Sequence, residues 1–151
     1  MKRARTILCL LLALVATAAT SPDRIIKVLP HLLDAEGRHS LSPSLYERDA
    51  YQAELRKHPE QVSGIRYDVQ LRHSDVNTSK GRLQIELRCA GRALTNSIIL
   101  ESDLTKTRRR GGWTHMQLDG DAYRKAGKVI AWRARLLDGS QVLAEQRSFL
   151  W

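Results

Sequence analysis

Apolar and polar side chains alternate strictly along residues 65–72, which read Ile-Arg-Tyr-Asp-Val-Gln-Leu-Arg. Successive side chains of a β-strand point to opposite faces, so this alternation predicts a strand with one buried and one solvent-exposed face. Residues 82–89 repeat the pattern, and Cys89 falls on the apolar side there. Sheets with one apolar and one polar face are typical of antiparallel β proteins. These two segments therefore predict an all-β fold.

Four further strands are predicted downstream, at residues 98–100, 113–118, 128–137 and 142–150. The last two are joined by Asp138-Gly139, a dipeptide typical of a β-hairpin turn. One face of the 128–137 strand carries apolar residues, namely Ile130, Trp132, Ala134 and Leu136. We expect Trp132 to be largely buried in the core.

Residues 19–64 predict an N-terminal extension with one strand and one short helix. The strand is expected from Ile25 to Leu29, and Pro30 confines it to a sheet edge because proline lacks an N–H group. Ser44 and Glu47 form a capping box, which predicts a helix over residues 45–57 that ends before Pro59. The apolar stripe of this helix is expected to comprise Tyr46, Ala50 and Ala53, with Tyr51 and Leu55 beside it.

Turn signals separate the predicted strands at short intervals, and no long helices alternate with them. This spacing favours an antiparallel sandwich over a parallel sheet. We therefore predict a single β-sandwich domain of six to seven strands over residues 65–151, preceded by the extension 19–64.

A resemblance to a known architecture is carried by residues 127–133, by Asp138-Gly139 and by residues 144–151. Together they resemble the last hairpin of an immunoglobulin-like or fibronectin-III-like sandwich. Leu118 followed by Tyr123 resembles the approach to the tyrosine corner of such domains, with a short helical turn across residues 121–126 as the alternative. The resemblance implies a fold only, because this architecture supports many unrelated functions.

The N-terminus has the three parts of a secretory signal peptide over residues 1–18. Lys2, Arg3 and Arg5 precede an apolar run at 7–15, and small residues follow at 16–18. We therefore expect export to the periplasm or the medium. Removal of this segment would leave Cys89 as the only cysteine, and its place in the alternation predicts a buried thiol.

Residues with catalytic potential are scattered along the sequence. The five histidines, His31, His39, His58, His73 and His115, show no metal-ligand spacing. There is no Gly-x-Ser-x-Gly motif and no glycine-rich phosphate loop. The sequence thus predicts no catalytic residues, metal or cofactor, and favours a non-enzymatic module that binds or scaffolds another macromolecule.

A basic segment gives an alternative function. The chain has 25 Lys and Arg against 16 Asp and Glu, a net charge of +9. Its densest positive cluster, with an adjacent aromatic side chain, comprises Lys106, Arg108, Arg109, Arg110 and Trp113. Such a segment could bind a polyanion, whether an acidic glycan, a nucleic acid or an anionic membrane surface. The competing interpretation is a solvated loop whose charge prevents pairing between sheet edges.

Overall fold

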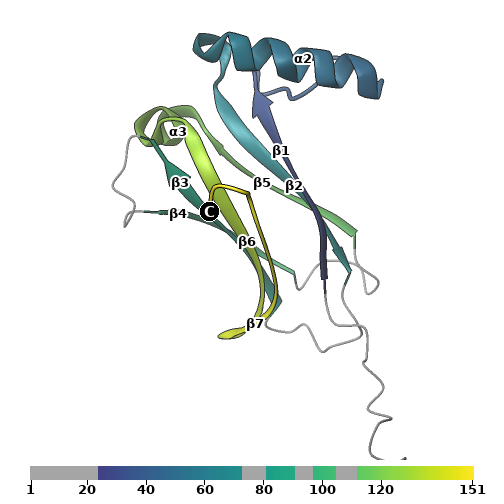
Figure 1. The fold of residues 1–151 in the computed structure, drawn as a ribbon, viewed down its shortest axis with the longest axis vertical. Helices are drawn as coiled ribbons and strands as arrows, with labels where there is room; N and C mark the ends of the chain where they lie inside the picture. The colour runs from purple at the N-terminus through teal and green to yellow at the C-terminus, as the bar shows by residue number, and fades with distance from the viewer. Residues whose placement is uncertain (1–23, 73–80, 91–96, 105–111) are drawn as a thin grey trace, which may run out of the picture.

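The computed structural model describes residues 24–72, 81–90, 97–104 and 112–151. Within these ranges, strands form two antiparallel sheets that pack on each other (Figure 1). The first sheet has the order β1 (Arg24–Leu33), β2 (Gly64–Arg72), β5 (Gly112–Asp119). The second has the order β4 (Ile98–Asp103), β3 (Gly81–Cys89), β6 (Val129–Asp138), β7 (Gln141–Arg147). The all-β sandwich predicted from the alternation is confirmed.

The observed strands differ from the predicted ones mainly at their ends. β1 continues through Pro30 to Leu33 and lies at a sheet edge, the place that suits proline. It pairs with β2 along its length, so the strand expected in the extension is a member of the three-stranded sheet. β7 ends at Arg147 rather than at residue 150, where the chain enters a turn.

The core lies between the sheets and consists of side chains from the apolar faces of the strands. Tyr67 and Val69 from β2 and Leu83, Ile85 and Leu87 from β3 are all 0% exposed. Alternation along residues 65–72 and 82–89 therefore predicted the buried face of both strands. Burial of Cys89 is also confirmed.

Two expectations for β6 need correction. Trp132 is only partly buried: it packs edge-on against Tyr67, with ring centroids 6.3 Å apart, and sits at the border of the core. β7 ends opposite Arg133, and beyond its end the Ser148 N–H still donates to the Trp132 carbonyl at 2.9 Å. Ile130 is 46% exposed, because the pairing with β3 shifts register between Arg88 and Cys89 and turns Ile130 away from the core.

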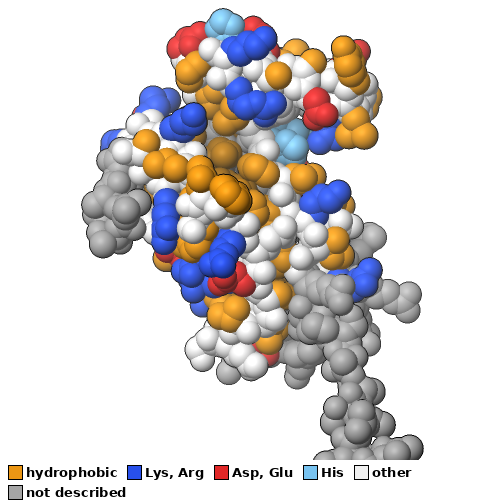
Figure 2. Space-filling model, in the orientation of Figure 1, with side chains coloured by type: hydrophobic (Ala, Val, Ile, Leu, Met, Phe, Trp, Pro, Cys, Tyr) orange, Lys and Arg blue, Asp and Glu red, His pale blue; other side chains and the backbone are white. Residues whose placement is uncertain are grey.

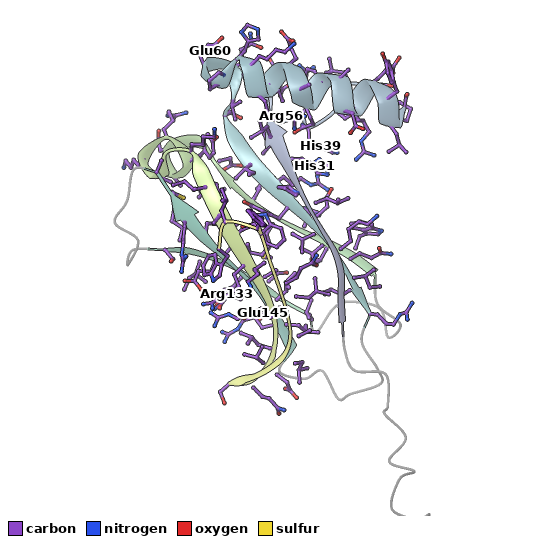
Figure 3. The ribbon with its side chains drawn as sticks, viewed as in Figure 1. His31, His39, Arg56, Glu60, Arg133 and Glu145 are labelled. Atoms are coloured by element: carbon purple, nitrogen blue, oxygen red, sulfur yellow. The ribbon has the colours of Figure 1, made fainter. Side chains whose placement is uncertain are left out.

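The outer face of the four-stranded sheet is polar and internally paired. Arg133 of β6 donates to the Glu86 carboxylate at 2.6 Å, and Gln84 donates to Glu101 at 2.7 Å. The Trp151 ring lies against the guanidinium groups of Arg88 and Arg133, at 3.9 and 4.7 Å. Figure 3 shows Arg133 on this face, away from the helix α2.

Helix α2 (Leu45–Lys57) has the predicted bounds, and a short 3₁₀ helix η2 (Pro59–Gln61) follows it. The predicted capping box is wrong, because the Ser44 side chain makes no capping hydrogen bond. The predicted apolar stripe is also wrong: Tyr46 is 84% exposed, and the buried residues are Gln52 and Leu55. α2 rests on the end of the three-stranded sheet by a narrow face (Figure 1).

Helix α3 (Gly120–Ala126) connects β5 to β6. It corresponds to the helical-turn alternative predicted for residues 121–126, which is confirmed. Tyr123 lies on this helix and packs against the core. Gly127 ends the helix at φ 75°, a left-handed conformation that favours glycine, and its N–H donates to the Tyr123 carbonyl at 3.0 Å.

Candidate functional site

Gln52 fixes helix α2 to the edge of the sandwich. Its side-chain amide accepts a hydrogen bond from the Leu32 N–H at 2.8 Å and donates to the Leu32 carbonyl at 2.9 Å. The amide also donates to the His39 carbonyl at 2.9 Å. Gln52 therefore satisfies both backbone groups of an edge-strand residue, as a neighbouring strand would.

Asp34 fixes the chain between β1 and α2. Its carboxylate accepts hydrogen bonds from the N–H groups of Glu36 and Arg38, from the Arg38 guanidinium at 2.8 Å and from the Tyr51 hydroxyl at 2.6 Å. Burial by itself would raise the pKa of Asp34, but the hydrogen bonds from Tyr51 and Arg38 outweigh it and lower the pKa to about 2. The carboxylate is therefore ionised at neutral pH.

A cleft of about 690 Å³ lies where α2 extends past the sheet and faces α3 and the start of β6. In Figure 2, hydrophobic side chains gather in the hollow beneath the helix. Most of the lining is apolar and comes from distant parts of the chain: Pro30, Leu32, Leu55, Pro59, Val62, Ile65, Tyr123 and Val129. The volume falls within the range of small-molecule binding sites.

The polar lining is mainly cationic. Arg56, Arg124 and Lys128 contribute positive charge, and Glu60 contributes the single carboxylate. Glu60 lies 3.1 Å from the His58 ring, and Arg124 pairs with Asp121. Within the described residues, Arg56 and Lys128 take part in no ion pair. Figure 3 shows Arg56 on the side of α2 that faces the cleft and Glu60 near the end of the helix.

The chemistry of this lining suits binding. Apolar side chains can exclude water from a ligand, and the cations can attract a negative group to it. Sequence reasoning missed this site because its residues come from β1, α2, η2, β2, α3 and β6. The local signals at this site are two prolines, of which Pro30 indicates an edge strand and Pro59 the end of a helix.

The structure brings together two of the histidines that are apart in sequence. The rings of His31 and His39 lie 5.2 Å apart, and His31 Nε2 is 3.7 Å from the Asp68 carboxylate (Figure 3). Burial lowers the pKa of both histidines, although Asp68 opposes this effect. Among the described residues, no group of three or more His, Cys, Asp or Glu could hold a metal ion.

The basic segment predicted from sequence falls largely outside the described residues, which exclude Lys106, Arg108, Arg109 and Arg110. Trp113 is described: it is 53% exposed on β5, opposite Gln70 of β2. None of the helices in the described ranges is long and apolar enough to cross a membrane.

Comparisons of the chain with models of protein families, with curated proteins and with solved structures find no match. The cleft and the fold are thus the observations on which a function can be argued.

Proposed function

We propose that the chain is an exported, non-enzymatic binding module that holds part of another macromolecule in the cleft beneath α2. The observation that carries this proposal is the lining of the cleft. Apolar residues from both sheets and both α-helices meet there, and Arg56 and Lys128 add positive charge that forms no ion pair within the described residues. An exposed apolar surface with a polar rim is typical of a binding site.

We further propose that the sandwich is of the immunoglobulin-like, fibronectin-III-like type. The strand order supports this assignment. The first, second and fifth strands share one sheet, and the third, sixth and seventh lie together in the other, as in immunoglobulin domains. β4 pairs with β3, which is the fibronectin-III-like variant of that order.

Export is proposed from the signal-like residues 1–18. The intact mass of the protein recovered from its native cells tests this directly. Loss of about the first eighteen residues supports export, and retention of Met1 would remove the proposed compartment.

Site-specific crosslinking tests the use of the cleft. A photoreactive residue is placed at Glu60, on the cleft, and separately at Gln141, the exposed first residue of β7. Irradiation in the native cells should give a macromolecular adduct of fixed mass from position 60 only. Adducts of equal yield from both positions, or none from position 60, would contradict the proposal.

A second candidate function is polyanion binding through the basic segment, favoured by the exposure of Trp113 next to it. Replacing Arg108, Arg109 and Arg110 by Ser should abolish salt-sensitive retention on heparin. The matched control replaces Lys57, Lys125 and Arg147 by Ser, because these are exposed cations without an ion pair in the described residues. Equal loss in both triple variants would show that net charge alone governs retention.

A further inference from the structure

We infer that the part of the macromolecule held in the cleft is an acyl chain next to an anionic head group. This inference rests on the proposed use of the cleft for binding and names the chemistry of what is bound. It follows from three properties of the cleft: its apolar lining, the state of its backbone groups and its charge.

The apolar lining is continuous across the cleft. Leu55 and Leu32 line it beneath α2, Val62 and Ile65 line it next to β2, and Val129 lines it at the start of β6. Leu55 and Ile65 are buried, whereas the others keep partial exposure that a ligand could cover. Removing each methylene of a chain from water at such a surface strengthens binding.

Backbone groups at several positions of the lining are already hydrogen-bonded within the protein. Gln52 forms hydrogen bonds with both the N–H and the carbonyl of Leu32, and Pro30 has no N–H group. The Val62 N–H donates to the Pro59 carbonyl, and the Gly127 N–H donates to the Tyr123 carbonyl. A peptide laid in the cleft would leave much of its own backbone without partners, which is unfavourable. An acyl chain has no backbone groups to satisfy.

The charge of the lining selects the head group. Arg56 on α2 and Lys128 just before β6 both line the cleft, and neither forms an ion pair within the described residues. The one acid of the lining, Glu60, lies beside the His58 ring, so the lining cations Arg56, Arg124 and Lys128 outnumber it. A carboxylate or phosphate head would therefore be attracted, and a quaternary ammonium head would be repelled.

Titration of the ¹⁵N-labelled protein with dodecanoate below its micelle concentration tests the inference. The amide signals of Val62, Ile65 and Val129 should shift together and saturate. Dodecyltrimethylammonium, which has the same chain and the opposite charge, should bind at least about fivefold more weakly. Octanoate should bind more weakly too, by about fourfold for each buried methylene removed.

Two double variants locate the head group. Arg56→Ser with Lys128→Ser should weaken dodecanoate binding about fivefold and remove the preference for an anionic head. Lys57→Ser with Lys125→Ser makes the same change in net charge next to the cleft, at exposed residues outside its lining, and should leave binding unchanged. Equal weakening in both pairs would show attraction by net charge alone and overturn the head-group assignment.

A blocked peptide of alternating leucine and glutamate separates this inference from the proposed function. If the peptide shifts the same amides and dodecanoate does not, the acyl inference is wrong and the cleft still binds a polypeptide. If neither shifts them, the inference is wrong as well, and crosslinking from Glu60 decides the proposed function on its own. Saturable binding of dodecanoate at these amides, with selectivity for its charge and length, supports the inference.

Discussion

The sandwich and the insert of residues 34–63, which carries α2, are held by different interactions. In the sandwich, the five core residues of β2 and β3 named above are fully buried, and apolar packing dominates. In the insert, Asp34, Gln52 and Leu55 are the buried side chains, and two of them are polar. Apolar packing is non-directional and its stabilisation grows with the area buried, whereas a hydrogen bond fixes distance and direction.

This difference bears on the cleft, which lies between the two regions. Its floor belongs to the stable sandwich, and one wall is the helix that Gln52 and Asp34 hold in place. A wall with little buried apolar surface is expected to open at a lower free energy than the core. The cleft can therefore admit a ligand without unfolding the sheets.

The largest effect is expected in the sandwich core. Ile85→Ala should lower the free energy of unfolding by roughly 3–4 kcal/mol, because it leaves a cavity between the sheets. Denaturant titration measures this change. Ile130→Ala, at a 46% exposed position on the neighbouring strand, is the matched control and should change it by less than about 0.5 kcal/mol. Similar losses in both variants would contradict the placement of the core.

Asp34→Asn should lower the free energy of unfolding at pH 7 by about 2 kcal/mol, because the buried charge-assisted hydrogen bonds weaken. The folded-state pKa of Asp34, about 2, lies below its ordinary value of 3.8. Its stabilisation is therefore present above about pH 4 and is lost as the pH falls through about 2. The gap between wild type and variant should narrow over that range, as measured by denaturant titration at several pH values. A constant gap would exclude the ionised carboxylate as its source.

Gln52→Ala should act mainly on the insert. Loss of the amide leaves the Leu32 N–H and carbonyl unpaired, which should speed hydrogen exchange in α2 about tenfold. The amides of β3 and β6 should exchange as in the wild type. Gln52→Glu serves as the comparison, since it keeps an acceptor for the Leu32 N–H and loses the donor to the two carbonyls. Equal acceleration in the core strands would mean that the insert and sandwich unfold as one unit.

The smallest effect is expected at Tyr46, on the exposed part of α2. Tyr46→Ala should change the thermal midpoint very little, because this side chain is 84% exposed. A decrease of more than about 1 kcal/mol in the free energy of unfolding would indicate that this part of the helix packs against other residues. Calorimetry of the two proteins at equal concentration provides the measurement.

The sequence allowed most strands to be predicted, and much less of the helix packing. Alternation identified the buried faces of β2 and β3, and the bounds of α2 followed from Ser44 and Pro59. Alternation did not predict burial where burial depended on how the strand pairs with its neighbours. Trp132 lies at the border of the core and is only partly buried, and Ile130 turns outward because of the register shift beside Cys89. The spacing of apolar residues along β6 does not indicate the exposure of either residue.

The sequence by itself determined which segments are strands and which face of most of them is apolar, because side-chain direction in a strand depends only on local backbone geometry. The tertiary structure alone decided the order of strands in the two sheets and the position of α2. Gln52 lies 20 residues from Leu32, and Ser63 lies 29 residues from the Asp34 carbonyl to which it donates. Contacts at such separations depend on the folded path of the chain, and the cleft exists only because they form.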